Sequence, residues 1–409
     1  MLPEFTRAAL AVVLSFSLCI LGFGAGAVRP PAGRPRSLRP ALRSAQAVNG
    51  PGLRREAAAG AQPGHGLASL EPPEATVLPS PFAPAPPAPS ARPVRGVYAT
   101  AYSTGAKKKF DEIIAFIRRT EVNALVIDVK DDSGTISYPS GIPLARAIGS
   151  GRAKFQPDTV MAVLAREGIY PIARIVAFKD PYLAAKRTDL AVRSKAGGLW
   201  RDRRGQLWVD PHNREVWRYV VDVAKEAARK GFREIQFDYV RFTSDGNLSD
   251  CVYPFATGQR KSDVIRDFLI YASRELKPLG VDVSADIFGL ACSAQGDLGI
   301  GQRIEQIATA VDIVSPMVYP SHYYRGTYGI PDPDLAPYET ILTSLKAALP
   351  RIAGLGVRLR PWLQDFSLRN KYNRPQLMAQ IKAVYDAGLT EWMFWNPSNS
   401  YDAAKYNPE

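Results

Sequence analysis

The sequence predicts an α/β fold: a (β/α)8 TIM barrel formed by residues 94–409, preceded by a disordered Pro/Ala-rich N-terminal segment. Strand-like and helix-like segments alternate along residues 94–409 with few breaks, and this alternation implies a parallel sheet. Eight repeats within these 316 residues fit one closed barrel. A doubly wound open sheet is the main alternative.

The expected strands are apolar and rich in β-branched residues; in chain order they cover residues 95–102, 124–131, 170–178, 234–242, 281–289, 312–320, 358–366 and 391–396. Amphipathic stretches with helical periodicity separate them, at residues 107–120, 159–168, 214–230, 262–277, 302–310, 337–349 and 375–387. Several helices end at a glycine just before the next strand, which is a common C-terminal stop: Gly168, Gly231, Gly280 and Gly388.

The composition separates residues 29–93 from the rest as a disordered Pro/Ala/Arg-rich linker. Residues 1–93 hold 16 of the 34 prolines but only 4 of the 40 aromatic residues, too few to bury the apolar surface that would offset chain entropy. This part has nine Arg and four Glu, or +5 of the total +13, which leaves a moderate +8 for residues 94–409. Because no motif of basic and interleaved aromatic residues occurs either, nucleic acid is not expected as a partner.

Residues 1–28 are expected to be a secretory signal peptide or a membrane anchor. The apolar run over residues 8–28 follows Arg7 and contains the triplet Ala-Gly-Ala at 25–27, which resembles a cleavage site. The run is also long enough to span a bilayer uncleaved. Either alternative places the barrel outside the cytoplasm, as a secreted, periplasmic or cell-surface protein, and in the second case residues 8–28 anchor it to a membrane.

Polar residues near the ends of the expected strands indicate where chemistry occurs, because TIM barrels place their active sites at the C-terminal ends of the strands. Four carboxylates at these positions are candidate catalytic residues: Asp128, Asp238, Asp286 and Asp365. Glycoside hydrolysis needs one carboxyl group as acid and another as nucleophile or base. Adjacent carboxylates also raise each other's pKa, which keeps one of them protonated.

Cationic and aromatic residues near the same strand ends are candidate substrate-binding groups. Arg174 and Arg241 are expected to hold the carboxylates ionised and in position. The aromatic side chains are expected to stack on the apolar faces of sugar rings, with a histidine beside them: Tyr319, Trp362, Trp395 and His322.

Other chemistries have weaker support in the sequence. The chain has neither a G-x-S-x-G motif nor a P-loop, which disfavours a serine hydrolase and a nucleotide-binding enzyme. A metal site would need His212 and His322 together with aspartates, and His212 is better explained as a loop residue before a helix capped by Asn213. Neither a metal nor another cofactor is predicted.

Several segments resemble the putative glycosyl hydrolase domain family of TIM-barrel, glycoside-hydrolase-like proteins: WVDP at 208–211, IQFDYVRF at 235–242, RGVY at 95–98, VIDVKDDSG at 126–134 and SPMVYP at 315–320. The resemblance covers residues 94–409 and implies the fold more strongly than the reaction. In related retaining barrels an aspartate at the end of the fourth strand is often the nucleophile, which matches Asp238. Their acid is commonly a glutamate on the fifth strand, where this sequence has Asp286.

Together these features predict a glycoside hydrolase that acts on an extracellular or cell-envelope polysaccharide. One alternative is a non-catalytic barrel that binds cell-wall carbohydrate, which the loss of a second inward carboxylate beside Asp238 would favour. The other is a metal-dependent sugar deacetylase, which requires His212, His322 and an aspartate within ligand distance of one another.

Two further predictions concern stability. Cys251 and Cys292 follow the fourth and fifth expected strands, which are neighbours in a closed barrel, and export would place both in an oxidising compartment. A disulfide between them is therefore expected. Residues 94–409 are also expected to fold without residues 1–93.

Overall fold

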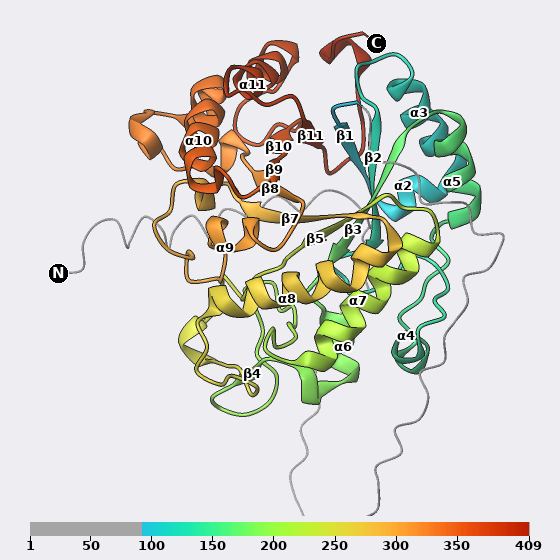
Figure 1. The fold of residues 1–409 in the computed structure, drawn as a ribbon, viewed down its shortest axis with the longest axis vertical. Coiled ribbons are helices and arrows are strands. Elements are labelled where there is room, and N and C mark those ends of the chain that lie inside the picture. The colour runs from blue at the N-terminus through green and yellow to red at the C-terminus, as the bar shows by residue number, and fades with distance from the viewer. Residues whose placement is uncertain (1–91, 409) are drawn as a thin grey trace, which may run out of the picture. The chain divides into compact units, whose positions relative to one another are not determined.

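The computed structural model describes residues 92–408, and every structural statement below concerns this part of the chain. Its main sheet is parallel and closes on itself (Figure 1), because β11 pairs with β1 at one seam and β10 pairs with both β11 and β8. The strands of the barrel are β1 (Arg95–Ala99), β2 (Ala124–Lys130), β3 (Tyr170–Val176), β5 (Glu234–Asp238), β7 (Asp282–Phe288), β8 (Ile313–Met317), β9 (Arg358–Leu359), β10 (Trp362–Gln364) and β11 (Trp392–Trp395). Since β9 and β10 are two pieces of the seventh expected strand, the predicted (β/α)8 barrel is confirmed and the open sheet is excluded.

Helices follow the strands and surround the barrel (Figure 1). They are α2 (Ala101–Gly105), α3 (Lys107–Ile117), α4 (Pro143–Ile148), α5 (Pro157–Arg166), α6 (Pro181–Lys186), α7 (Arg214–Arg229), α8 (Lys261–Leu276), α9 (Ile304–Ala308), α10 (Pro337–Ile352) and α11 (Arg374–Asp386). None of the helices within residues 92–408 is long and apolar enough to cross a membrane. The predicted signal peptide or anchor, and all but two residues of the predicted linker, lie outside the described residues.

Helix α7 shows how the local sequence sets these elements. The side chain of Asn213 accepts hydrogen bonds from the backbone N–H groups of Glu215 at 2.7 Å and Val216 at 3.4 Å, so it caps the helix as predicted. Apolar residues then recur at helical spacing and are buried against the barrel: Val216, Val220, Val223 and Ala227.

All eight strands end earlier than the sequence predicts, and for three of them a local reason is clear. The first ends at Ala99 because Thr100 caps helix α2, accepting a hydrogen bond from the N–H of Ser103 at 3.1 Å. The fourth ends at Asp238 because Tyr239 adopts a positive φ of 49°. The seventh is divided near Pro361, which has no backbone N–H to donate to the sheet.

The interior of the barrel differs between its two ends. Ion pairs fill the floor, where the strands begin, and both apolar and polar side chains fill the mouth, where the strands end. At the floor, buried Arg360 contacts Glu234 at 2.8 Å and Glu391 at 3.1 Å. Above this layer, Trp362 belongs to a cluster of buried apolar residues inside the barrel that also includes Met393 and Val126. The buried charges of this floor are therefore paired, which offsets the cost of removing them from water.

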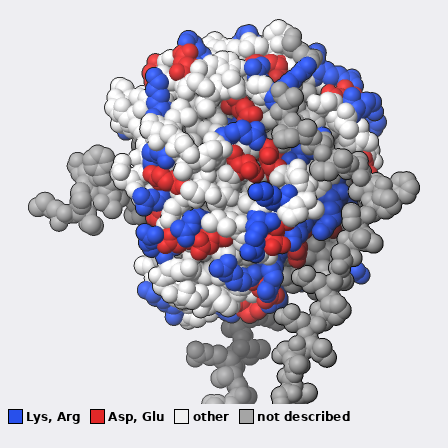
Figure 2. Space-filling model, viewed as in Figure 1, with Lys and Arg blue, Asp and Glu red and all other residues white. Residues whose placement is uncertain are grey.

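Long loops after β3 and β5 join in a small second sheet over the mouth of the barrel. Its strands β4 (Arg193–Ser194) and β6 (Cys251–Val252) are antiparallel, and Asp210 further ties the two loops together by accepting a hydrogen bond from the N–H of Phe255 at 2.9 Å. On the face drawn in Figure 2, basic and acidic side chains are interspersed over the described surface, which fits the moderate net charge of the barrel.

The predicted disulfide is wrong, because Cys251 and Cys292 are both free thiols. The second sheet holds Cys251 in β6, where its sulfur lies 3.7 Å from the hydroxyl of Thr243. Cys292 is buried beside α10, and its carbonyl accepts a hydrogen bond from Arg351 at 2.8 Å. The sequence placed both residues in loops after adjacent strands but carried no information on the directions that these loops take.

Candidate active site

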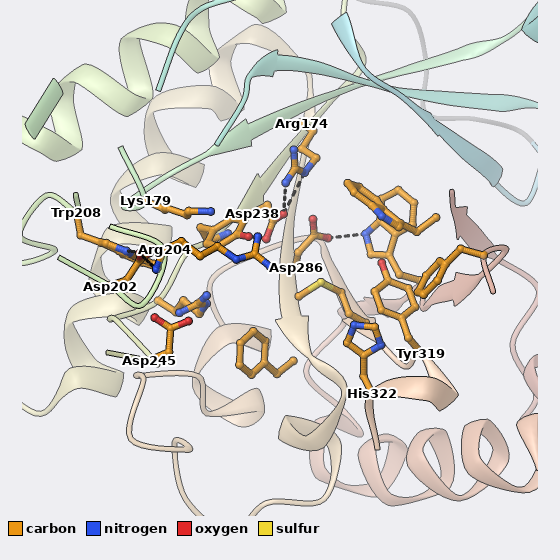
Figure 3. A pocket seen from close by; sticks show the side chains of 17 residues that line it. Arg174, Lys179, Asp202, Arg204, Trp208, Asp238, Asp245, Asp286, Tyr319 and His322 are labelled. Carbon is orange, nitrogen blue, oxygen red and sulfur yellow. Dashed lines mark hydrogen bonds and ion pairs between the residues drawn. The ribbon is translucent and has the colours of Figure 1, made fainter. Parts of the chain in front are cut away.

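A pocket with about 800 Å³ of empty space lies where the strands end, at the face where TIM barrels carry their chemistry (Figure 3). Its lining is Arg174, Lys179, Asp202, Arg204, Trp208, Asp238, Tyr239, Arg241, Asp245, Asp286, Phe288, Met317, Tyr319, His322, Trp362, Phe366 and Trp395. The pocket therefore contains two of the four predicted catalytic carboxylates and every predicted substrate-binding residue.

Asp238 is the last residue of β5, and its carboxylate is held by charged and backbone donors. Arg174 donates to one oxygen from Nε at 3.0 Å and from Nη2 at 2.5 Å. The N–H of Tyr239 donates to the other oxygen at 2.6 Å. Tyr239 makes this hydrogen bond in a backbone conformation with a positive φ. A non-glycine residue in this conformation is strained, and such strain is often found at functional sites. These three hydrogen bonds hold the Asp238 carboxylate in a fixed position.

Asp128 lies behind Arg174 and does not line the pocket. It accepts hydrogen bonds from Nη1 of Arg174 at 2.6 Å and from the hydroxyl of Tyr98 at 2.6 Å. Burial raises the pKa of Asp128 to about 6, although the charge of Arg174 acts in the opposite direction. This geometry gives Asp128 the position of a residue that orients Arg174, rather than one that touches a substrate.

Asp286 is the neighbour of Asp238 on the adjacent strand. The register pairs Phe237 with Ala285, so the next residues along β5 and β7 are the two aspartates, side by side on the inner face. Figure 3 shows both side chains directed into the pocket. The only hydrogen bond to the Asp286 carboxyl group described in the structure comes from Nε1 of Trp362, at 2.8 Å. Burial, followed by the negative charge of Asp238, raises the pKa of Asp286 well above its ordinary value.

The two carboxyl groups thus have opposite surroundings. Asp238 faces a guanidinium group and a backbone N–H, whereas Asp286 faces a neutral indole and the charge of Asp238. Different surroundings of this kind separate the roles of the two carboxyl groups in paired-carboxylate sites. It can therefore supply a nucleophile or base and an acid within one pocket.

Aromatic side chains form the wall of the pocket beside Asp286. Trp395 stacks on Tyr98 with 3.8 Å between ring centroids, and its edge meets Trp362 at 5.6 Å. Tyr319 packs against His322 at 5.4 Å. Burial lowers the pKa of His322 to about 3, so this histidine is neutral near pH 7. Aromatic and neutral surfaces of this kind suit the apolar faces of sugar rings.

Two predicted roles do not match the geometry. Asp365 lies outside the pocket, where it accepts hydrogen bonds from Lys405 at 3.1 Å and Tyr406 at 2.9 Å and so holds the C-terminal segment. Arg241 lines the pocket, but its hydrogen bonds go to the carbonyl of Phe242 and the hydroxyl of Ser244, and not to Asp238. Of the two predicted arginines, Arg174 contacts Asp238 and Arg241 does not.

The histidines that a metal site would need have separate surroundings. His212 hydrogen-bonds Asp210 at 2.7 Å and packs on Phe242, whereas His322 hydrogen-bonds Ser321 and packs on Tyr319. Within residues 92–408 there is no group of three His, Cys, Asp or Glu residues that could hold a metal ion. The grouping that would favour a sugar deacetylase is therefore not found in the described part of the chain.

The sequence analysis did not single out several pocket residues: Lys179, Asp202, Arg204, Trp208, Tyr239, Asp245, Phe288, Met317 and Phe366. Three of them, Asp202, Arg204 and Trp208, belong to the connection between β3 and α7, which runs from residue 177 to residue 213. The sequence predicts no helix or strand between the expected strand at 170–178 and the expected helix at 214–230, and long segments of this kind often carry function, so the length of this segment was the available signal.

Comparisons with known proteins agree with this architecture. Residues 96–401 match the family described as "Putative glycosyl hydrolase domain". A hypothetical protein from Ruminiclostridium thermocellum ATCC 27405 is 41% identical, with a TM-score of 0.44, over 46% of this chain and 96% of its own. The PgaB (BpsB) glycoside hydrolase domain from Bordetella bronchiseptica is 15% identical, with a TM-score of 0.57, over 76% of this chain and 97% of its own.

The glycoside hydrolase domain of PelA from Pseudomonas aeruginosa is 12% identical, with a TM-score of 0.46, over 76% of this chain and 97% of its own. No curated protein matches the chain. The likeness to PgaB shows a shared fold, and the family match extends over nearly the whole barrel. The chain therefore belongs to the putative glycosyl hydrolase domain family, and its class is that of a putative glycoside hydrolase.

Proposed function

We propose that this protein hydrolyses glycosidic bonds in an extracellular or cell-envelope polysaccharide, with Asp238 as nucleophile and Asp286 as acid. The observation that carries the proposal is the contrast between two neighbouring carboxyl groups, one bound to Arg174 and the other beside an indole and a negative charge. A non-catalytic barrel has no need to keep a second buried carboxyl group next to Asp238, since that burial is costly.

The proposed reaction proceeds in two steps. Asp286 gives its proton to the glycosidic oxygen as the bond from this oxygen to the anomeric carbon breaks, while Asp238 forms a bond to that carbon. Asp286, now ionised, then removes a proton from water, whose oxygen attacks the anomeric carbon and releases Asp238. Arg174 positions Asp238 and stabilises it as the leaving carboxylate in the second step.

The rim of the pocket supports a polymeric substrate. Four exposed large apolar side chains lie in segments that follow barrel strands, on the face of the barrel that carries the pocket: Tyr102 in helix α2, Phe255, Leu335 and Leu368. We infer that they extend the binding surface beyond the pocket. The extracellular or cell-envelope location rests on the expected export segment at residues 1–28.

A panel of cell-wall and capsular polysaccharides tests the proposal, with release of reducing ends as the measurement. On any polymer that is cleaved, Asp238→Asn and Asp286→Asn should each lower kcat by about 10³-fold or more. Asp312→Asn is the matched control, because Asp312 lies at the opposite end of the barrel and an asparagine oxygen can still accept the N–H of Val283. Its activity should equal that of the wild type.

Either of two outcomes would contradict the proposed function. One is cleavage that survives in Asp238→Asn with less than about tenfold loss, which corresponds to about 1.4 kcal/mol. The other is tight binding of a polysaccharide without any release of reducing ends, which would identify the protein as a non-catalytic carbohydrate-binding barrel.

A further inference from the structure

The pocket has two unlike halves, on either side of Asp238 and Asp286. Figure 3 shows Tyr319 and His322 on one side of the two aspartates, and Lys179, Arg204 and Trp208 on the other. The first half is the aromatic wall described above. The second half, which we name the cationic half, also contains Asp202, Arg241 and Asp245 and is closed by the rings of Tyr239 and Phe288.

Arg241 is a buried cation whose guanidinium group makes no salt bridge to a carboxylate within the described residues. It is 6% exposed, and its described hydrogen bonds, both from Nη1, go to the carbonyl of Phe242 at 3.0 Å and the hydroxyl of Ser244 at 2.9 Å. Burial lowers the pKa of Arg241, although Tyr239 and the carboxylates of Asp238, Asp245 and Asp202 act in the opposite direction.

Aromatic rings surround the guanidinium group of Arg241. Its central carbon lies 4.8 Å from the ring centre of Phe288, 4.9 Å from that of Trp208 and 5.0 Å from that of Tyr239. Rings of this kind stabilise a cation and also exclude water from it. They do not replace the charge-assisted hydrogen bonds that an anion provides, so Arg241 is prepared for an anionic ligand.

Arg204 is a second cation directed at the same space. It is half-buried, and its guanidinium group takes part in no ion pair among residues 92–408. The loop that carries it is fixed by Asp202, whose carboxylate accepts the N–H groups of Arg204 at 2.9 Å and Gln206 at 2.8 Å and the indole N–H of Trp208 at 3.1 Å. Arg204 is therefore presented to the pocket on a turn of defined geometry.

The remaining charges of the cationic half are already engaged. Lys179 pairs with Asp132 at 3.2 Å, Asp202 accepts the three hydrogen bonds given above, and Asp245 accepts the N–H of Arg203 at 3.4 Å. The charge of Lys179 is therefore balanced by Asp132, whereas Arg204 and Arg241 form no ion pair in the described part of the chain.

We propose that the cationic half is a subsite for an anionic sugar unit, whose carboxylate, phosphate or sulfate group is bound by Arg241 and Arg204. This inference rests on the proposed function, and it narrows the substrate class to acidic polysaccharides. The guanidinium group of an arginine can donate two parallel hydrogen bonds to two oxygens of any of these three anionic groups. A neutral hydroxyl group cannot accept this pair of hydrogen bonds. Trp208 and Tyr239 pack against the ring of the same sugar unit, and Asp238 lies beside it at the reacting carbon.

Binding of small sugars to the full chain tests the subsite without any need for cleavage. The probes are glucose, glucuronate, galacturonate, glucose 6-phosphate and glucose 6-sulfate, and affinity is measured by ligand-observed NMR titration at low and high salt. At least one anionic sugar should bind about tenfold more tightly than glucose, because hydrogen bonds to charged groups contribute more than neutral ones. The difference should shrink at high salt. The separate probes distinguish a carboxylate from a phosphate or sulfate.

Three variants localise the binding. Arg204→Gln should abolish most of the preference for the anionic sugar, and Arg241→Lys, which keeps the buried charge but cannot donate this pair of parallel hydrogen bonds, should reduce it. Arg203→Gln is the matched control, because Arg203 lies next in sequence, is exposed and does not line the pocket. It should bind like the wild type.

The inference is overturned if no anionic sugar binds more tightly than glucose, or if Arg204→Gln and Arg203→Gln affect binding equally. Its failure is distinguishable from failure of the proposed function. Efficient cleavage of a neutral polysaccharide that depends on Asp238, with no preference for anionic sugars, would refute the subsite alone. Selective binding of an anionic sugar without hydrolysis of any acidic polysaccharide would refute the reaction and leave the subsite standing.

Discussion

Asp238 and Asp286 are chemically identical side chains with nearly the same burial, 7% and 2% exposed, so their neighbours decide which of them keeps a proton. Arg174 and a backbone N–H donate hydrogen bonds to Asp238, whereas burial and the charge of Asp238 raise the pKa of Asp286. At the scale of single residues, the role of each carboxyl group therefore depends on its hydrogen-bond donors and on the charges next to it.

Stability should reveal the raised pKa of Asp286. Because its pKa is higher in the folded than in the unfolded protein, its protonated form stabilises the fold at low pH. That contribution is lost as the pH rises from the unfolded value, about 4, through the folded value. Asp286→Asn cannot lose a proton and still accepts the indole N–H of Trp362.

The free energy of unfolding of Asp286→Asn, measured in urea, should therefore improve relative to the wild type between about pH 4 and pH 7. A constant difference between the two proteins over this range would mean that Asp286 titrates normally.

Arg174 is predicted to be a positioning residue with a large effect on stability. Arg174→Gln leaves the buried carboxylates of Asp128 and Asp238 without their cation, and breaking a buried pair from one side costs about 3–5 kcal/mol. Urea unfolding should show this loss. Arg203→Gln, at an exposed arginine, should stay within about 0.5 kcal/mol of the wild type. Equal stability of the two variants would contradict the central place of Arg174.

The sequence could predict Arg174, Asp238 and Asp286 because each is a charged residue within a strand, where burial is costly without a purpose. The same reasoning selected Asp365, which fails because its carboxylate bonds Lys405 and Tyr406 from the last residues of the chain. Such a contact between distant segments leaves no periodic pattern near Asp365.

At the scale of elements, the register between β5 and β7 sets the distance between the reacting groups. Residues in register on neighbouring strands are separated by about 4.7–4.9 Å, and the two aspartates extend this register on one face. Retaining glycosidases need carboxyl groups about 5–5.5 Å apart, and inverting ones need about 6.5–9.5 Å. The strand pairing therefore predicts that the reaction retains the anomeric configuration of the cleaved bond.

NMR of the first-formed product tests this prediction once a cleaved polymer is known. The new reducing end should have the anomeric configuration of the bond that was cut, before mutarotation changes it. A product of opposite configuration would show that water attacks directly, and Asp238 would then be a base.

Strands and helices were predictable because apolar periodicity directly reflects burial. The second sheet of β4 and β6 was not, since each strand has two residues and pairs across a separation of more than 50 positions. This sheet also explains the wrong disulfide prediction, because it holds Cys251 away from the buried site of Cys292 beside α10. Adjacent strands do not ensure that the loops following them meet.

At the scale of the whole molecule, the barrel closes with residues near its own two ends. Arg95 at the start of β1 pairs in register with Trp392 of β11, and the N–H of Val94 bonds Glu391 at 3.2 Å. Residues 94–409 should therefore fold without residues 1–93, with the same thermal midpoint as the longer chain. An aggregated or unfolded product from residues 94–409, beside a soluble longer chain, would contradict this prediction.

The two-carboxylate mechanism is tested most directly by the pKa of Asp286, followed by NMR of 13C-labelled aspartate carboxyl groups and assigned by the signal missing in Asp286→Asn. In the wild type this pKa should lie well above the ordinary value for aspartate. In Asp238→Asn it should fall, because the negative charge beside Asp286 is removed while the charge of Arg174 remains. An Asp286 that titrates at the ordinary value, or whose pKa is the same in both proteins, would contradict the proposed pairing of nucleophile and acid.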